Sequence, residues 1–380
     1  MSQFQFPQVT ISGTGLWHPE HSISNEELVQ VLNENADRYN TQHAAEIEAG
    51  ELQPLAKSDA DFITKASGIK QRYVYEKEGI LDLNRMRPNL PARAEDELSY
   101  QAEMAVKAAQ AALDNAQKKA ADIDAVIVSC AYTERAYPAI AIEVQEQLGI
   151  TGFGFDMLVA CSAATFGLHR AYEMIRSGSA KAVLVVNPEL VTPQLNYADR
   201  DSHFIFGDVA TAVIVEAEET VTTDTYFKVL STKAVTQYSN NIRSNFGHLS
   251  RAHDSDVFAS PNLFHQEGRK VFKEVCPMAA KHMTEHLSAH NIENAQVKRW
   301  FLHQANLNMN QLIAKKLLGR PATNDEAPTI LDEFGNTASA GSIIAFNRHN
   351  SDFKHGDIGM ICSFGAGYSI GSLAVECVKK

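Results

Sequence analysis

The chain has 380 residues, a formal net charge of −12 and 44% hydrophobic residues, which is enough for a large core and two or three domains. No apolar run approaches the roughly 18–20 residues of a membrane span, and the first residues lack the pattern of a secretion signal. The acidic balance argues against nucleic-acid binding, which needs a basic surface. Five scattered cysteines argue against a disulfide framework and favour a reducing compartment. We therefore expect a cytoplasmic, globular protein with no nucleic-acid or membrane partner.

Strand and helix patterns alternate along most of the chain. An alternating segment at 9–15 predicts a strand, and Ser24 with Glu27 predicts a capping box at a helix start. Residues 79–95, which are rich in proline and arginine, predict a long loop. The predicted elements that follow are a helix at 95–117, a strand at 125–128, a helix at 139–148, a strand at 155–159, a helix at 162–176 and a strand at 182–186. This alternation favours a buried, largely parallel sheet.

The second half of the chain repeats this plan. Its predicted elements are a helix at 266–290, a strand at 300–302, a helix at 307–318, a helix after 335–337 and a strand at 358–362. In the first half, 33 residues separate Val128 in a predicted strand from Cys161 at a predicted helix start. In the second half, 34 residues separate Leu302 in a strand from Asn336 at a helix start. From those helix starts to the next strand the spacing is 22 residues in both halves. We therefore expect a duplication in which Cys161 and Asn336 occupy equivalent helix starts that meet at one interface.

Three polar residues lie at strand-to-helix switches, where α/β proteins place catalytic groups. Cys161 lies among small residues at a helix start, where the helix dipole lowers the pKa of a thiol. His303 directly follows a strand, and Asn336 precedes the last predicted helix. Taken singly, each is more often structural: a packing cysteine, a core or capping histidine, and an ordinary helix cap. Together they predict a nucleophile with hydrogen-bond donors for a developing oxyanion.

A glycine-rich segment, Ser363–Tyr368, follows the last predicted strand and lets backbone N–H groups approach a ligand closely. Its glycine spacing does not fit a dinucleotide-binding loop. From about residue 9 to 376, the chain resembles the β-ketoacyl-ACP synthase III family of the thiolase superfamily. The motifs that carry the resemblance, in family order, are Ala160-Cys161-Ser162, Arg200 with Phe206-Gly207-Asp208, His303-Gln304-Ala305-Asn306, Gly335-Asn336-Thr337 and Phe364-Gly365-Ala366-Gly367.

The resemblance implies an α/β fold, namely a thiolase-like five-layer αβαβα sandwich of two pseudo-twofold-related halves, usually in a homodimer. The first half would be residues 1–218, which carry Cys161. The second half would be residues 219–380, which carry His303 and Asn336.

The resemblance also implies a decarboxylative Claisen condensation in fatty-acid or related biosynthesis. Cys161 would take the acyl group of an acyl-CoA primer, and the acyl-enzyme would react with malonyl-ACP to give a 3-oxoacyl-ACP. His303 and Asn336 would hydrogen-bond the malonyl thioester and stabilise its enolate. Backbone N–H groups of Cys161 and Ala366 would form the oxyanion hole. Because loss of CO₂ generates the carbanion, no cofactor and no metal are expected.

Four further residues are expected to contact substrate by the same resemblance: Tyr137, Arg200, Phe206 and Asn306. Tyr137 takes the place of a phenylalanine that crosses the family's dimer interface and floors the acyl pocket.

The chain departs from the family at the CoA site. A tryptophan and an arginine that often enclose the adenine align with Phe62 and Ala66, and Asn308 replaces a frequent arginine. The chain is also longer than usual, mainly at 33–60, 79–95 and 240–262. With weaker CoA contacts, burial of a longer acyl chain would supply binding free energy at about 0.8 kcal/mol per CH₂. We therefore predict a primer of roughly six to ten carbons rather than acetyl-CoA.

Two charged clusters have alternative interpretations. Lys315, Lys316 and Arg320 predict a docking patch for the acidic acyl carrier protein, or else an ordinary charged surface. His282, with two further histidines at helical spacing, predicts a solvated helix face rather than a metal site.

Two rival functions stay open at this point. One is an acyltransferase of the same fold that transfers an acyl group to an alcohol or amine without decarboxylation. The other is a non-catalytic paralogue that acts as a binding partner. An acyltransferase of the first kind should lack the Asn336 amide. A non-catalytic paralogue should lack at least one of Cys161, His303 and Asn336, whereas this chain retains all three.

Overall fold

The computed structural model describes residues 6–254, 256 and 259–380. Within these residues a nine-stranded sheet has the order β11-β12-β13-β8-β1-β7-β6-β4-β5. Its strands are β1 (Val9–Trp17), β4 (Ala125–Cys130), β5 (Phe153–Leu158), β6 (Ala182–Glu189), β7 (Val209–Ala217), β8 (Thr225–Ser239), β11 (Val297–Leu302), β12 (Ile358–Gly365) and β13 (Gly367–Lys379). Two small sheets pair β2 (His21–Ser24) with β3 (Gln71–Val74), and β9 (Ile242–Arg243) with β10 (His265–Gln266).

The large sheet consists of two runs with the same connectivity. In the first run β4 pairs in parallel with β6, which continues through the antiparallel strands β7 and β1. In the second run β11 pairs in parallel with β12, which continues through the antiparallel strands β13 and β8. The runs meet where β1 pairs with β8. This repeat gives the pseudo-twofold arrangement that the sequence spacing predicts.

The prediction of a largely parallel sheet is wrong. Among the described strands of the large sheet, only β4–β5, β4–β6 and β11–β12 pair in parallel. The error arises because β7, β8 and β13 follow the preceding strands of the chain without an intervening α-helix. In particular, Ala366 alone joins β12 to β13, so the glycine-rich segment is a tight turn between two strands.

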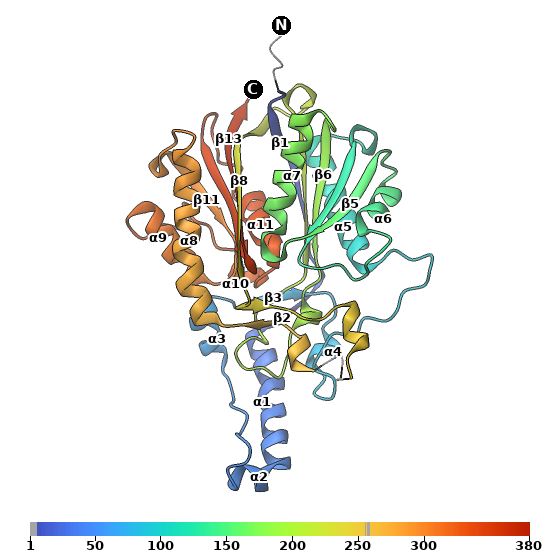
Figure 1. Cartoon of the computed structure of the whole chain (residues 1–380), viewed down its shortest axis with the longest axis vertical. Coiled ribbons are helices and arrows are strands. Elements are labelled where there is room, and N and C mark those ends of the chain that lie inside the picture. The colour runs from blue at the N-terminus through green and yellow to red at the C-terminus, as the bar shows by residue number, and fades with distance from the viewer. Residues whose placement is uncertain (1–5, 255, 257–258) are drawn as a thin grey trace.

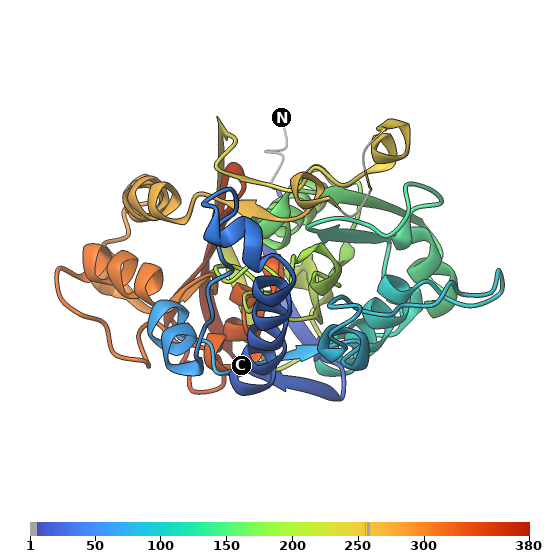
Figure 2. The ribbon, with the colours of Figure 1, turned by 90° about the horizontal axis from the view of Figure 1, so that it is seen from below.

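Helices form three layers around the two runs of strands (Figure 1, Figure 2). The outer layers are α5 (Tyr100–Ala116) with α6 (Ile140–Leu148) on the first run and α8 (Gly268–Ser288) with α9 (Leu307–Leu318) on the second. The middle layer is α7 (Ala163–Ser177) with α11 (Gly341–Arg348). The result is the five-layer αβαβα sandwich, in agreement with the expected fold class.

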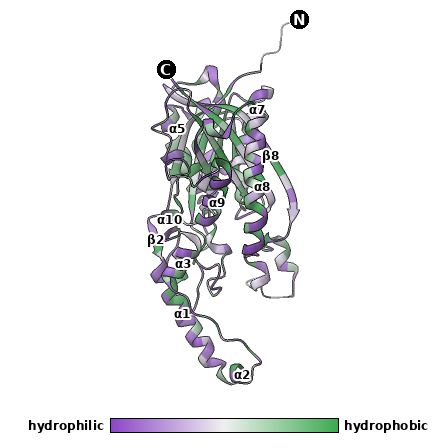
Figure 3. Cartoon of the chain, turned by 90° about the vertical axis from the view of Figure 1, so that its left-hand side faces the viewer, coloured by the Kyte–Doolittle hydropathy of each residue, from purple (hydrophilic) through white to green (hydrophobic). Residues whose placement is uncertain are grey.

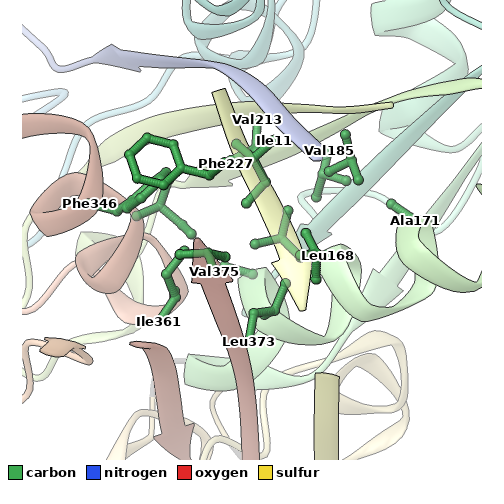
Figure 4. Close-up of a cluster of buried hydrophobic side chains, with 14 of the residues drawn as sticks. Ile11, Leu168, Ala171, Val185, Val213, Phe227, Phe346, Ile361, Leu373 and Val375 are labelled. Carbon is green, nitrogen blue, oxygen red and sulfur yellow. The ribbon is translucent and has the colours of Figure 1, made fainter. Parts of the chain in front are cut away.

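The middle of the sandwich is a continuous apolar core (Figure 4). Leu168 of α7 and Phe346 of α11 pack with Val185 from the first run and with Phe227 and Leu373 from the second. Burying a side chain of this kind contributes about 1.5–3 kcal/mol, so this core holds the two halves together and fixes how the central helices begin.

An arm extends beyond the sandwich at the end opposite the two termini (Figure 1, Figure 3). It consists of α1 (Asn25–Gln42) and α2 (Ala44–Glu48), and α3 (Ala60–Ser67) returns the chain to the body. The predicted capping box is confirmed, because the Ser24 N–H donates to Glu27 at 2.8 Å and the Glu27 N–H donates to the Ser24 hydroxyl at 3.2 Å. Much of α1 is hydrophilic in Figure 3, as expected for a helix with few buried residues.

The remaining short helices are α4 (Glu78–Leu81) and α10 (Leu331–Phe334). Apart from α4, residues 79–95 form the predicted loop. The helix predicted from 95 begins at Tyr100, because Ser99 is its N-cap and accepts the Ala102 N–H. Among the described residues, no helix combines the length and the apolar character needed to cross a membrane.

The predicted solvated histidine face is wrong for His282 and His286 of α8, whereas His290 is exposed as predicted. His282 and His286 are buried against β8 and β13, where both donate to or accept from the Ser372 hydroxyl, at 2.9 and 2.7 Å. His286 also shares a hydrogen bond with Ser231 at 2.9 Å. Burial lowers the pKa of His282 to about 4 and of His286 to about 3, so both are neutral packing residues.

Candidate active site

Cys161 lies in a 3-10 turn, η2 (Ala160–Ser162), at the start of the central helix α7. Ala160 has a φ of 44°, a left-handed conformation that turns the chain sharply from β5 into the helix. Opposite the turn, a Cβ atom at Gly365 would lie 2.5 Å from the Cys161 Cβ atom. Only glycine therefore leaves room for the Cys161 side chain at this end of the sheet.

Burial, aided by the charge of Glu189, raises the pKa of the Cys161 thiol to about 12. The backbone N–H groups of Ala366 and Cys161 oppose this shift. The prediction of a lowered thiol pKa is therefore wrong, because desolvation outweighs the helix start and the backbone donors. The thiol is protonated in the free protein, so its ionisation must accompany the reaction with an acyl donor.

His303 directly follows β11, and its backbone N–H donates to the Cys362 carbonyl of β12 at 2.8 Å. Its ring packs edge-on against Phe364 at 5.2 Å and is 2% exposed. Burial lowers the pKa of His303 to about 4, so the imidazole is neutral near pH 7. A neutral imidazole offers one N–H donor without a positive charge.

Asn336 is held by its backbone on both sides. Its N–H donates to Ile205 at 2.9 Å, and its carbonyl accepts the Gly207 N–H at 3.1 Å, which places it beside Phe206. Its side-chain oxygen accepts the Ala338 N–H at 3.0 Å. The amide nitrogen has no partner among the described residues, so two N–H groups are available to a ligand.

The duplication pairs Cys161 with a residue other than Asn336. A second 3-10 turn, η8 (Ala338–Ala340), leads into α11 as η2 leads into α7, and Ala338 has a φ of 47°. Ala338 is thus the counterpart of Ala160, and Ser339 is the counterpart of Cys161. The matching sequence spacings hid this offset, because the loop before the second turn is longer.

The two turns also differ in what opposes them. Gly365 ends β12 and faces Cys161, whereas Glu189 ends β6 and binds Ser339. Sequence reasoning missed Glu189, because a carboxylate at the end of an apolar strand carries no motif of its own. Its burial and its partners become evident only when the halves are packed together.

The predicted catalytic residues are brought together. Cys161, His303 and Asn336 line one cavity of about 390 Å³. Two of the predicted substrate residues, Phe206 and Asn306, line it as well. Asn306 also caps α9 through its side-chain oxygen and donates to the Ala66 carbonyl at 2.7 Å, so it fixes one wall of the cavity.

The other predicted substrate residues lie elsewhere. Tyr137 is 84% exposed, in the loop after β4, and lines neither of the two cavities described for this chain. The Arg200 guanidinium lies 4.0 Å over the Phe62 ring and donates to the Lys57 carbonyl at 2.7 Å. Arg200 and Phe62 therefore contact each other at the position where the family resemblance implies that adenine is enclosed.

A second cavity of about 700 Å³ lies beside the first and was not predicted. Ala131 and Tyr132 line it, and the rest of the described wall comes from 85–90, 193–198, Ser244, Phe246, Asn262 and Leu263. Two of the insertions noted in the sequence thus meet at one cavity. Ala131, Tyr132 and Cys161 pack against the same apolar cluster, so this cluster contacts both the wall of the second cavity and the residue that bears the thiol.

The predicted docking residues differ in their surroundings. Lys315 and Lys316 are exposed in the last turn of α9. Arg320 donates to both carboxylate oxygens of Glu326, at 2.9 and 2.6 Å, so much of its charge is already paired. The two lysines are therefore the main unpaired cations of the predicted patch.

Comparisons with known proteins agree with this geometry. The model of 3-oxoacyl-[acyl-carrier-protein] synthase III matches residues 155–235, and the model of its C-terminal part matches residues 287–377. The chain is 58% identical over 339 residues to a β-ketodecanoyl-[acyl-carrier-protein] synthase of Pseudomonas aeruginosa, covering 89% of this chain and 97% of that protein.

More distant relatives extend the match. A β-ketoacyl-[acyl-carrier-protein] synthase III of Bartonella tribocorum is 29% identical over 375 residues, covering 96% of this chain and 98% of that protein. The crystal structure of the priming β-ketosynthase of the R1128 polyketide pathway shares the fold, with a TM-score of 0.78 at 21% identity, covering 99% of this chain and 98% of that one. With Cys161, His303 and Asn336 in one cavity, this chain belongs to the β-ketoacyl-ACP synthase III family of acyl-transferring condensing enzymes.

Proposed function

We propose that the chain condenses a medium-chain acyl-CoA primer with malonyl-ACP to give a 3-oxoacyl-ACP. The observation that carries the proposal is the single cavity lined by Cys161, His303 and Asn336, with a second cavity of mixed apolar and polar lining beside it. The P. aeruginosa relative is named for a ketodecanoyl product. Since malonyl extension adds two carbons, such a product derives from an octanoyl primer, which falls within the range predicted from the sequence.

The first step is transfer of the acyl group to Cys161. The sulfur attacks the thioester carbonyl, and the backbone N–H groups of Cys161 and Ala366 stabilise the tetrahedral oxyanion. The bond to CoA sulfur then breaks, and the proton lost by the thiol leaves with CoA. Both backbone donors already oppose the rise in the pKa of the thiol that burial causes, which supports this assignment.

The second step uses the malonyl thioester. The neutral His303 imidazole and the Asn336 amide donate to its carbonyl oxygen, so that loss of CO₂ leaves a stabilised enolate. The enolate carbon attacks the acyl-Cys161 carbonyl, and the carbon–sulfur bond breaks. The product is 3-oxoacyl-ACP, and the released thiolate takes a proton from solvent.

The second cavity gives the acyl chain a place to lie. From Cys161 the chain would extend past Ala131 and Tyr132 into this cavity, whose volume falls within the range of about 300–1,000 Å³ usual for ligand pockets. Contact with the apolar part of this wall, which includes Met86, Leu195 and Phe246, would stabilise each buried methylene by about 0.8 kcal/mol.

Release of CO₂ tests the proposed reaction. With octanoyl-CoA and malonyl-ACP, CO₂ and 3-oxodecanoyl-ACP should form in equal amounts. An acyltransferase that does not decarboxylate would consume octanoyl-CoA without releasing CO₂. A non-catalytic paralogue would consume neither octanoyl-CoA nor malonyl-ACP.

The edge strand β5 supports a homodimer as part of the proposal. Phe153 and Leu158 on this strand are 45% and 54% exposed, and Tyr137 in the loop after β4 is exposed too. An unpaired apolar edge favours pairing with a second copy, in which Tyr137 would reach the partner's acyl cavity. Residence in the cytoplasm stays a prediction.

Replacing Leu158 with Asp should weaken the dimer, because a charge would be buried between the paired edges. Sedimentation or light scattering should then show monomers at concentrations where the wild type is dimeric. Val235→Asp is a matched control, since Val235 is similarly exposed on β8. A wild type that is monomeric at all concentrations would contradict the homodimer.

We also propose a boundary between the halves at residues 218 and 219. It lies in the segment between β7 and β8, the last strand of the first run and the first strand of the second. The two runs of equal connectivity support this division.

Carrier-protein docking on Lys315 and Lys316 predicts a charge-reversal effect. Lys316→Glu should raise KM for malonyl-ACP several-fold and change the rate with malonyl-CoA little, because exposed charges mainly affect encounter. The difference from wild type should shrink at high salt. Steady-state kinetics with the two malonyl donors measure this effect.

Lys181→Glu provides the control, because Lys181 is an exposed lysine in the first half of the chain, just before β6. An equal loss with both malonyl donors in the Lys316 variant would contradict docking there. Arg320→Glu should have a smaller effect than Lys316→Glu, because Glu326 already pairs with Arg320.

A further inference from the structure

Glu189 is a buried carboxyl group that the steps above do not use. It ends β6 and is 1% exposed. Its carboxylate accepts hydrogen bonds from the Ala131 N–H at 3.1 Å and from the Ser339 N–H at 3.2 Å, and it also accepts the Ser339 hydroxyl proton. A carboxylate that receives several donors is stabilised in its charged form.

These hydrogen bonds join two parts of the site. Ser339 is the centre of η8, the turn that follows Asn336 and whose first residue, Ala338, donates to the Asn336 side chain. Ala131 begins the loop after β4 and lines the second cavity. Glu189 therefore links two parts of the site through hydrogen bonds. One is the turn that follows Asn336, and the other is the cavity wall along which the acyl chain would run.

The charge of Glu189 also acts on the thiol. The titratable groups that face it are the Cys161 thiol in η2, the Cys130 thiol at the end of β4 and the Tyr132 hydroxyl in the loop that follows. Burial raises the pKa of all three, so each is neutral near pH 7. Burial raises the pKa of Glu189 itself to about 7, and its hydrogen bonds oppose that shift.

We propose that Glu189 is a positioning residue with two effects: it fixes the Asn336 turn through Ser339, and its negative charge opposes ionisation of the Cys161 thiol. The proposal rests on the two-step chemistry given above. The fixed turn favours the malonyl step, whereas the charge slows reaction of the free thiol. A thiol kept protonated between turnovers is also less open to oxidation and alkylation.

Glu189→Gln separates the two effects, because it removes the charge at nearly constant size. Alkylation of Cys161 by iodoacetamide at about pH 9, where a carboxyl group with a pKa of about 7 is charged, should become several-fold to about tenfold faster, and its pH profile should move to lower pH. CO₂ release from malonyl-ACP by the octanoyl-enzyme should fall on the order of tenfold, because one buried donor loses its acceptor.

Two further variants complete the test. Glu189→Asp keeps the charge but shortens the reach, so its alkylation profile should match the wild type while CO₂ release falls. Ser339→Ala removes the hydroxyl and should also slow CO₂ release. Ser342→Ala is the matched control, since the Ser342 hydroxyl is equally buried in the central layer but bonds Ser363, at 2.7 Å, and it should behave as wild type.

A uniform loss of both readouts in the Gln variant, together with a lower melting temperature, would show a merely structural role and overturn the proposal. Unchanged or slower alkylation in a well-folded Gln variant would overturn the electrostatic part. Normal CO₂ release by Ser339→Ala would overturn the positioning part, even if the Gln variant did not fold. If wild-type enzyme releases no CO₂ at all, the proposed function fails instead, while alkylation still tests the charge.

Discussion

Replacing Cys161 with Ala abolishes acyl-enzyme formation, whereas replacing His303 or Asn336 with Ala leaves acylation largely intact and stops CO₂ release. The expectation follows from position. Cys161 carries the acyl group, and only its own backbone and that of Ala366 are assigned to the acylation oxyanion. His303 and Asn336 offer side-chain N–H donors to the malonyl carbonyl, and loss of one such donor costs on the order of 10²–10³ in rate. Mass spectrometry after incubation with octanoyl-CoA measures the first step, and CO₂ release measures the second.

Cys276→Ala is the matched control, because Cys276 is a buried thiol on α8 outside the cavity. It should acylate and condense like the wild type. An octanoyl adduct on Cys130, Cys276, Cys362 or Cys377 in the Cys161 variant would contradict the assignment. Equal loss of acylation in all three alanine variants would mean that His303 and Asn336 are needed for the first step too.

Octanoyl-CoA should be preferred to acetyl-CoA by up to about 10³-fold in kcat/KM. The six additional methylenes contribute about 0.8 kcal/mol each when buried, which is about 5 kcal/mol at most. Part of this is offset by ordering the chain, so the observed ratio should be smaller than the full burial would give. Competition between acetyl-CoA and octanoyl-CoA at fixed malonyl-ACP measures the ratio directly.

A variant that fills the second cavity sharpens this prediction. Ala198 lines that cavity but not the one that contains the thiol, so Ala198→Trp should reduce kcat/KM for octanoyl-CoA much more than for acetyl-CoA. The preference should then move toward shorter primers. A wild type that prefers acetyl-CoA would end the hypothesis of a medium-chain primer, and an equal effect of Ala198→Trp on both primers would place the chain elsewhere.

The parts of the site that sequence could predict are those set by local pattern. Cys161, His303 and Asn336 each stand at the end of a strand or the start of a turn, and such positions are visible as a change of hydrophobic period. The ends of two helices were predictable for the same local reason. They lie at Gly149, with a φ of 70°, and at Gly178, with a φ of 77°.

The parts that could not be predicted depend on contacts between distant segments. The raised pKa of Cys161 comes from burial and from the charge of Glu189. This residue lies on β6, away from Cys161 in sequence, and belongs to no recognisable motif. The sequence position of His286 on α8 is also compatible with an exposed residue, yet β8 and β13 bury its side chain. The second cavity exists because residues 85–90 line it together with Tyr132, Ser244, Phe246, Asn262 and Leu263, which are far from them in sequence.

The origin of the second cavity has a consequence for engineering product length. Its walls come mainly from loops, whereas Cys161, His303 and Asn336 are fixed at the ends of core strands and central turns. A gene library confined to the codons for residues 85–90, 193, 194, 196, 198, 244 and 246 would therefore vary the chain-length limit while it leaves the sandwich and the catalytic turns unchanged. In such a library, selection for new 3-oxoacyl products would work on segments that tolerate substitution, so product length could be tuned at small cost in folding stability.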